Sequence, residues 1–156
     1  MPSRRAAIAM SSAEITTFLS EGSVLTVASM GPAGRPHLAP LWYYPAEHVL
    51  RTWTFAKSQK ALNLRRDPRA TAQVESGRSY EELRGVVMEC DVELVEDADQ
   101  VATIGATLMA RYHTGGGPDD PAITAMVRAQ APKRVGLVLR PTAIASWDHR
   151  KLGGTY

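Results

Sequence analysis

The sequence has 156 residues, of which 44% are hydrophobic and 22% charged, and its net charge is +2; this is ordinary for one globular domain. It contains no apolar run near the roughly 20 residues of a membrane-spanning helix, and its first ten residues lack the apolar stretch of a signal peptide. The single cysteine, Cys90, excludes an internal disulfide. We therefore expect a cytoplasmic protein with a flexible tail at residues 1–10 and one domain at residues 11–156.

The first half of the domain is predicted to contain one helix followed by three strands. Residues 11–14 (Ser-Ser-Ala-Glu) fit a capping box, so a helix begins there. The short segments 23–30, 37–44 and 49–55 are rich in β-branched or aromatic residues and are predicted strands. Pro40 lacks a backbone N–H, which favours an edge position, a bulge or an interruption of pairing in the second strand.

The second half adds more strands and the main helices. Residues 86–95 alternate between apolar and mostly polar side chains, which is typical of a strand with one buried face. Further strands are predicted at residues 69–75 and 135–145, and helices after Ser58, after Asp97 or Asp99, and at residues 122–131. Five or six strands joined by short turns predict a mainly β (α+β) domain, an antiparallel barrel with added helices.

Metal and hydrolytic sites have no pattern in this sequence. The four histidines are not spaced as paired ligands, and we expect no bound metal; they are His37, His48, His113 and His149. No GxSxG elbow is present. Cys90 lies on the apolar face of its strand, so we expect it to be a small buried hydrophobic residue.

Positive charge is concentrated between residues 57 and 69, where five cations and Asp67 give +4 and leave −2 for the rest of the chain. Lys57 and Lys60 lie at the N-terminal end of the helix that follows Ser58, where the helix dipole disfavours cations. A bound phosphate would reverse this balance, because backbone N–H groups, the Ser58 hydroxyl and two ammonium groups would converge on its oxygens. The alternative is that both lysines point into solvent, at a cost of only ~0.3–1 kcal/mol each.

The neighbouring arginines and aromatic residues have simpler explanations. Arg65 and Arg66 lie in the last turn of this helix, where cations are favoured, and need no ligand. The basic segment contains no aromatic side chain on which bases could stack, so we expect no nucleic-acid partner. Residues 41–44 (LWYY) and Trp53 are candidates for the core or for a wall against a planar ring.

Several segments together resemble a known family. They are "GRPHLAPLWY", "TFAKSQKALNLRRDPRA", "YEELRGVVMECDVELVED" and a helix that ends in "ARY". In order and spacing they resemble the pyridoxamine 5'-phosphate oxidase-like FMN-binding split-barrel superfamily, from about Ala13 to Leu152. The closing "SWDHRKLGG" is similar to the actinobacterial branch that uses the deazaflavin coenzyme F-420.

The resemblance implies a homodimer of six-stranded antiparallel split β-barrels with flanking helices and with cofactor clefts between the subunits. The cofactor ring would lie along the second and third strands, and its phosphate would bind the basic motif. The implied cofactor-binding residues are Pro40, Leu41, Trp42, Thr54, Lys57, Ser58, Lys60 and Asn63. Trp147 and His149 match a tail that reaches a neighbouring subunit's cleft and closes it around the substrate.

One departure from the family pattern bears on function. In the oxidase, an arginine in the second strand binds the cofactor phosphate. The matching position in this sequence is at about Ala39, so the arginine is missing. This argues against vitamin B6 oxidation and favours F-420 over FMN. We therefore expect an F-420-dependent oxidoreductase that transfers a hydride between the cofactor and a small organic acceptor, with His37 or His149 as candidate proton donors. The alternatives are an FMN-dependent oxidase or flavin reductase, and a non-enzymatic cofactor- or haem-binding protein.

Overall fold

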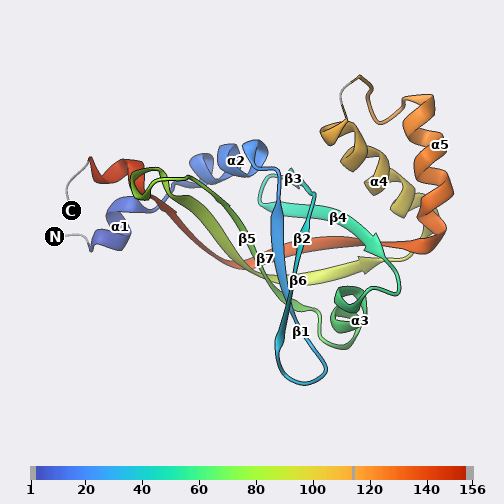
Figure 1. The fold of residues 1–156 in the computed structure, drawn as a ribbon, viewed down its shortest axis with the longest axis horizontal. Coiled ribbons are helices and arrows are strands. Elements are labelled where there is room, and N and C mark those ends of the chain that lie inside the picture. Colours follow the sequence, from blue (N-terminus) through green and yellow to red (C-terminus); the bar gives the residue numbers. More distant parts are fainter. Residues whose placement is uncertain (1–2, 114, 154–156) are drawn as a thin grey trace.

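The computed structural model describes residues 3–113 and 115–153, which fold around a single antiparallel sheet (Figure 1). Its seven strands are β1 (Leu25–Met30), β2 (Pro36–Leu41), β3 (Tyr44–Ala46), β4 (Val49–Phe55), β5 (Arg69–Ser76), β6 (Arg84–Val95) and β7 (Arg134–Asp148). They lie side by side in the order β2-β1-β5-β6-β7-β4-β3. The sheet curls into an open half-barrel whose two edges are β2 and β3 (Figure 1).

The prediction of six strands is wrong by one, because the segment at residues 37–44 divides. Strand β2 ends at Leu41 and pairs with β1, whereas β3 begins at Tyr44 and pairs with β4 at the opposite edge. The two residues between them carry the chain from one edge of the sheet to the other. Pro40 lies in β2, where its missing N–H can face the unpaired side, so the predicted edge position is confirmed.

In the described part of the chain, five α-helices flank the sheet: α1 (Arg4–Ile8), α2 (Ser12–Glu21), α3 (Gln59–Arg66), α4 (Ala98–Tyr112) and α5 (Pro121–Gln130). The predicted capping box begins α2, since the Glu14 backbone N–H donates to Ser11 Oγ and the Ser11 N–H donates to the Glu14 carboxylate. Helices α4 and α5 cover one end of the sheet beside β4, and α3 lies below them (Figure 1). Within the described ranges, no helix is both long enough and apolar enough to cross a membrane.

The N-terminal residues, which the sequence predicts to be a flexible tail, contain the short helix α1 in their described part. Helix α1 contacts the 3-10 helix η3 (His149–Leu152) near the other end of the chain. The Met10 backbone N–H donates to Ser146 Oγ at 2.9 Å, and Lys151 Nζ donates to the Ala9 carbonyl oxygen at 2.8 Å. The first and the last segments that the structure describes therefore lie together, away from α4 and α5 (Figure 1).

Buried side chains form two clusters. The larger lies between the sheet and helices α2 and α3, and it includes Leu19, Leu64 and Cys90. Cys90 is thus the buried residue that the alternating pattern of its strand predicts, and burial raises the pKa of its thiol to about 12. The smaller cluster joins β4 and β7 to α4 and α5, and Trp53 of β4 packs directly over Gly105 of α4.

Replacement of Gly105 by alanine tests this packing. A Cβ atom at this position would lie 2.3 Å from the Trp53 ring, so Gly105→Ala should lower the free energy of unfolding by ~1–3 kcal/mol despite the better helix propensity of alanine. Urea unfolding measures the difference. Gly117→Ala is the control, because a Cβ there would meet no atom within 4 Å. Equal or greater stability of Gly105→Ala would contradict the close contact.

Candidate functional site

The first turn of α3 follows directly from the end of β4. Ser58 caps the helix, and its Oγ accepts a hydrogen bond from the Ala61 backbone N–H at 3.3 Å. The Thr54 hydroxyl, the last buried side chain of β4, lies 3.3 Å from the same Oγ. The strand thereby fixes the helix start. N–H groups of a first helical turn that lack an intrahelical partner favour a nearby anion.

The three arginines of the basic segment have partners within the protein. Arg65 donates two hydrogen bonds to Glu96 and one to a backbone carbonyl group. Arg66 donates to the backbone carbonyl group at the end of β1. Arg69 forms an ion pair with Asp67 at 2.7 Å and holds the pKa of that carboxyl below its usual range. The prediction that Arg65 and Arg66 need no ligand therefore agrees with their contacts.

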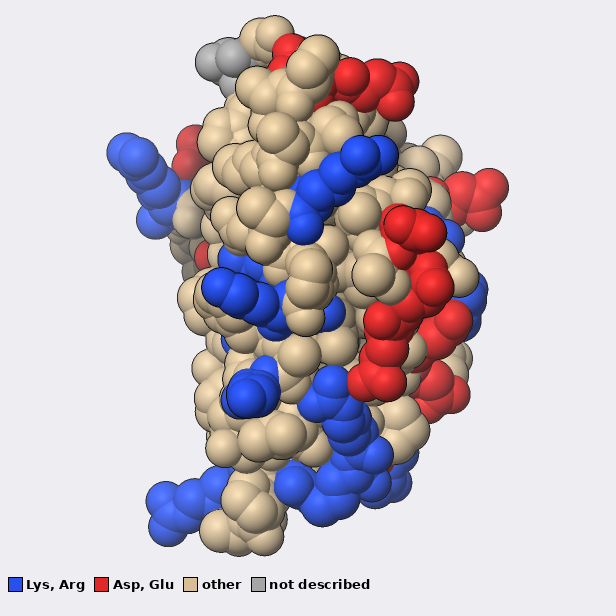
Figure 2. Space-filling model, turned by 90° about the vertical axis from the view of Figure 1, so that its right-hand side faces the viewer, with Lys and Arg blue, Asp and Glu red and all other residues tan. Residues whose placement is uncertain are grey.

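Lys57 and Lys60 differ from these arginines. Across residues 3–113 and 115–153, neither ammonium group has a hydrogen-bond or ion-pair partner. Lys60 is half-buried, and the loss of solvent lowers its pKa. Basic side chains gather over the lower part of the face on which α3 lies (Figure 2). Two cations without a counter-charge at the positive end of a helix repel each other and the helix dipole unless an anion binds.

A buried polar network continues from this helix to β1. Asn63 is fully buried, and its Nδ2 donates to Ser29 Oγ at 3.1 Å while its Oδ1 accepts from Gln59 at 2.8 Å. His37 of β2 is paired directly with Ser29, so both side chains lie on the same face of the sheet. His37 Nδ1 is buried and has no hydrogen-bond partner in the described chain. The structure therefore places this histidine beside α3, with a polar atom that lacks a partner.

A cleft opens where the sheet is split. Strand β3 pairs with β4 only at Val49 to Arg51, so the rest of β4 has a free edge on that side among the described strands. The cleft has a volume of about 460 Å³ and is lined by Val24, Pro40, Leu41, Trp42, Thr52, Trp53, Leu108, Met109 and Arg134. Three of the residues implied to contact a cofactor ring, Pro40 to Trp42, line it. Strand β4 links the two features, because Thr52 and Trp53 line the cleft and Thr54 contacts the cap of α3.

Trp42 forms a fixed wall of this cleft. Its ring stacks on that of Tyr112 with the centroids 4.6 Å apart and the planes 4° from parallel. The Tyr112 hydroxyl accepts from the Tyr43 backbone N–H at 3.0 Å and lies 2.8 Å from the carbonyl oxygens of Ser23 and Tyr43. The last turn of α4 therefore fixes the tryptophan, although Trp42 as a residue is 46% exposed. A rigid, exposed indole is suited to packing against a planar ring.

The one charged residue of the cleft lining, Arg134, was not among the residues that the sequence predicted for the site. Its guanidinium lies 4.5 Å from the ring centroid of Trp53 and 4.2 Å from that of Phe55. Its Nε and Nη2 both donate to Gln130 Oε1, at 3.1 and 2.7 Å. Only the pairing of β4 with β7, which sets Phe55 opposite Arg134, brings this cation to the cleft. No motif within either strand predicts that pairing.

The structure places Trp147 and His149 far from this cleft in their own chain. Trp147 packs over Gly85, and His149 Nδ1 lies 2.8 Å from the Tyr80 carbonyl oxygen. Both lie near the chain ends, whereas the cleft lies beside α4 at the other end of the sheet (Figure 1). A role of these two residues at a neighbouring subunit's cleft stays a prediction.

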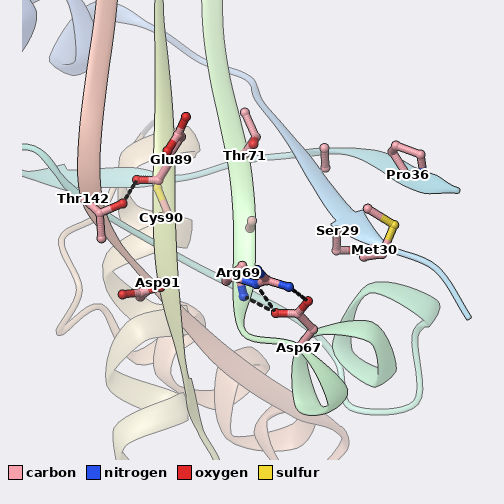
Figure 3. Close-up of a pocket in the computed structure, with 12 residues that line it drawn as sticks. Ser29, Met30, Pro36, Asp67, Arg69, Thr71, Glu89, Cys90, Asp91 and Thr142 are labelled. Atoms are coloured by element: carbon pink, nitrogen blue, oxygen red, sulfur yellow. Dashed lines mark hydrogen bonds and ion pairs between the residues drawn. The ribbon is translucent and has the colours of Figure 1, made fainter. Parts of the chain in front are cut away.

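A second hollow, of about 410 Å³, crosses strands β1, β5, β6 and β7. Figure 3 shows Arg69 turned toward Asp67, with Glu89 and Asp91 on the neighbouring strand β6 and the Thr142 hydroxyl donating to the Glu89 carbonyl oxygen. The one cation of its lining is neutralised by Asp67, and two further carboxylates add negative charge. This hollow therefore does not suit a phosphate, and it contains none of the predicted cofactor-binding residues. Among the described residues, no three histidine, cysteine or acidic side chains are grouped to hold a metal.

The comparisons with known proteins show the family and agree with the fold. The sequence matches the family model described as pyridoxamine 5'-phosphate oxidase over residues 11–148. Conserved hypothetical protein Rv2991 from Mycobacterium tuberculosis is 41% identical, with a TM-score of 0.88 over 99% of this chain and 95% of that chain. No curated protein matches the sequence.

Two more distant structures share the fold. An F-420 reductase is 24% identical, with a TM-score of 0.64 over 83% of this chain and 94% of that chain. HutZ, the heme storage protein from Vibrio cholerae, is 16% identical, with a TM-score of 0.66 over 86% of this chain and 93% of that chain. The curled sheet with a cleft at its split edge defines a split-barrel protein. The chain belongs to the pyridoxamine 5'-phosphate oxidase family.

The anchoring of the C-terminal segment can be tested through Asp148. Its carboxylate accepts from the Arg150 backbone N–H and forms an ion pair with the Arg150 side chain at 2.6 Å, which lowers the pKa of Asp148. Because the folded protein favours the carboxylate, this stabilisation is complete above about pH 5 and is lost as the pH falls through and below the ordinary aspartate range. Asp148→Asn should cost ~0.5–1 kcal/mol at pH 7 and less at pH 3.5.

Urea unfolding at pH 7, 5 and 3.5 measures this difference between the parent and Asp148→Asn. Asp119→Asn, in an exposed loop, serves as the control and should show little difference at any pH. A difference for Asp148→Asn that is constant from pH 7 to 3.5 would contradict the ion pair.

Proposed function

We propose that the chain binds the deazaflavin F-420 and is an F-420-dependent oxidoreductase acting on a small organic acceptor. The observation that carries this proposal is the pair of lysines without a counter-charge at the N-terminus of α3, at the end of the strand that also lines the cleft. The cofactor phosphate would bind at this helix end, and the ring would lie against residues 40–42. FMN is the alternative cofactor, because its phosphate and ring have similar requirements.

The residues present fit such a group. Lys57, Lys60 and the Ser58 hydroxyl would supply charge-assisted and neutral hydrogen bonds to phosphate oxygens, together with the backbone N–H groups of the first turn. Asn63 stabilises this turn, because its Oδ1 accepts a hydrogen bond from Gln59 of the first turn. The unpartnered Nδ1 of His37, on the same face of the sheet, is a further polar atom that a phosphate-bearing ligand could satisfy.

Two observations favour F-420 over FMN. Ala39 of β2 is buried and apolar, where a pyridoxamine 5'-phosphate oxidase has an arginine that grips the FMN phosphate. The C-terminal sequence resembles the F-420-using branch, and a protein described as an F-420 reductase shares the fold. Neither observation depends on the other.

The protein's part in the reaction is to bind, orient and exclude water. When bound, F-420 supplies hydride transfer to an electron-poor double bond. The free backbone edges of β2 and β4 can hydrogen-bond a ring edge-on, while Trp42 covers one side of the cleft. His37 is paired with Ser29, which contacts α3 through Asn63, and it is not part of the cleft lining, so we do not place it at the ring. This leaves His149 of a neighbouring subunit, together with Trp147, as the candidate proton donor and cover.

The phosphate site is tested by replacing Lys60. A charge-assisted bond to a phosphate is worth ~1.5–3 kcal/mol, so Lys60→Ala should weaken F-420 binding roughly ten- to a hundredfold, and Lys60→Glu should weaken it further. Stability without cofactor should be unchanged or slightly higher, because a cation leaves the positive end of a helix. Parallel fluorescence titrations with F-420 and FMN measure both the effect and the preferred cofactor.

Arg128→Ala is the matched control, because Arg128 is an exposed cation on α5, away from α3. Arg66 is less suitable, since its side chain also hydrogen-bonds Asn63. Parent-like affinity of both Lys57→Ala and Lys60→Ala would contradict the site. Oxidation of reduced F-420 by an added acceptor, followed by absorbance, separates an enzyme from a cofactor carrier.

We further propose a homodimer, as the family resemblance implies. Large apolar side chains are exposed on the sheet, including Leu38 on the edge strand β2, which is 64% exposed, and Met30 and Ile144. Sedimentation equilibrium at micromolar concentration should show a dimer. A monomer under these conditions would contradict both the shared cleft and the roles of Trp147 and His149.

A further inference from the structure

The cleft beside Trp42 has one charged residue in an otherwise uncharged lining. Arg134 is that residue, and the other eight residues of the lining are apolar, aromatic or, for Thr52, a neutral hydroxyl. Apolar pockets with a few fixed polar groups are typical of sites for small organic ligands, and the polar groups set which ligand binds. The charge in this cleft is therefore its main chemical signature.

Arg134 is held in place but not neutralised. The rings of Trp53 and Phe55 flank its guanidinium, and Gln130 Oε1 accepts two of its N–H groups. Three of its five N–H groups have no acceptor, and no carboxylate lies within ion-pair distance, in the part of the chain that the structure describes. Partial burial also lowers its pKa. A cation–π role alone would explain the position of this side chain but not its free donors facing a cleft.

The neighbouring aromatic side chains indicate the shape of the ligand. Phe55 is 55% exposed beside Arg134, and Trp42 is exposed across the cleft and is fixed on Tyr112. Exposed, fixed aromatic rings bind flat molecules well, and a guanidinium fork binds a carboxylate through two parallel hydrogen bonds.

We propose that this cleft selects a planar, conjugated acceptor that carries a carboxylate, and that Arg134 is the specificity-determining residue that binds the carboxylate. The identity of this ligand as a hydride acceptor rests on the proposed function, whereas the anion selectivity of the cleft does not. Lys57 and Lys60 would bind the cofactor phosphate at the helix, and the acceptor would lie in the same cleft as the cofactor ring, with its carboxylate on Arg134.

The test uses the full chain and two probes of nearly the same shape, 2-naphthoate and 2-naphthamide, in isothermal titration calorimetry. The parent should bind 2-naphthoate at least tenfold more tightly than 2-naphthamide. Arg134→Gln should remove this preference and leave 2-naphthamide binding within about threefold of the parent. Arg134→Lys, which keeps the charge but not the fork, should retain part of the preference and guards against a folding defect in the glutamine variant.

Arg128→Gln is the control on α5 and should behave as the parent does. Equal affinity of the parent for the two probes, no binding of 2-naphthoate, or a preference retained in Arg134→Gln would each overturn the proposal. Lys60→Ala should leave the preference for 2-naphthoate intact while weakening F-420 binding. A failure of the acceptor proposal is therefore distinguishable from a failure of the cofactor proposal.

Discussion

The binding features of this protein depend on one interruption of the backbone, at Trp42 and Tyr43 between β2 and β3. A residue at which the chain leaves a strand normally loses the hydrogen-bond partners of its backbone N–H and C=O groups. Here the Tyr112 hydroxyl accepts from the Tyr43 N–H and lies within hydrogen-bond distance of the Tyr43 carbonyl oxygen, so one side chain of α4 replaces a neighbouring strand. The buried Tyr43 hydroxyl donates to the Leu19 carbonyl oxygen at 2.6 Å and fixes the position from the other side. The sheet can therefore stay open, with the cleft at the opening.

The two ends of helix α3 differ in their contacts with the rest of the protein. Its last turn and the following residues bind the protein itself, through Arg65 to Glu96 and through Arg66 and Asn63 to β1. Its N-terminal end has two lysines, Lys57 before the cap and Lys60 in the first turn, which do not help an isolated helix. A short helix tolerates this unfavourable charge because the buried contacts of Asn63 and Leu64 already hold it against the sheet. Packing at one end stabilises the helix enough to offset the unfavourable charges at the other end. That other end is therefore available for a ligand.

The parts of the fold that depend on neighbouring residues were predictable from the sequence. The capping box of α2, the helix between Ser58 and Asp67, and the alternating strand that buries Cys90 all rest on patterns within a few residues. The seventh strand was not predictable, because residues 37–44 read as one apolar run and only the distant partners of its two halves divide it. The same reason explains Arg134, whose place at the cleft depends on pairing between β4 and β7, about 80 residues apart along the chain.

The length of β7 limits how one chain can use its own groups. Arg134 begins this strand, and Trp147 lies thirteen residues further along it. At ~3.3 Å per residue a strand of this length reaches up to about 43 Å. Its two ends lie at opposite ends of the curled sheet (Figure 1), where Arg134 and Trp147 line separate hollows. A single chain therefore cannot bring Arg134 and Trp147 to the same small ligand. Any ligand that touches both must lie where the beginning of one β7 meets the end of another.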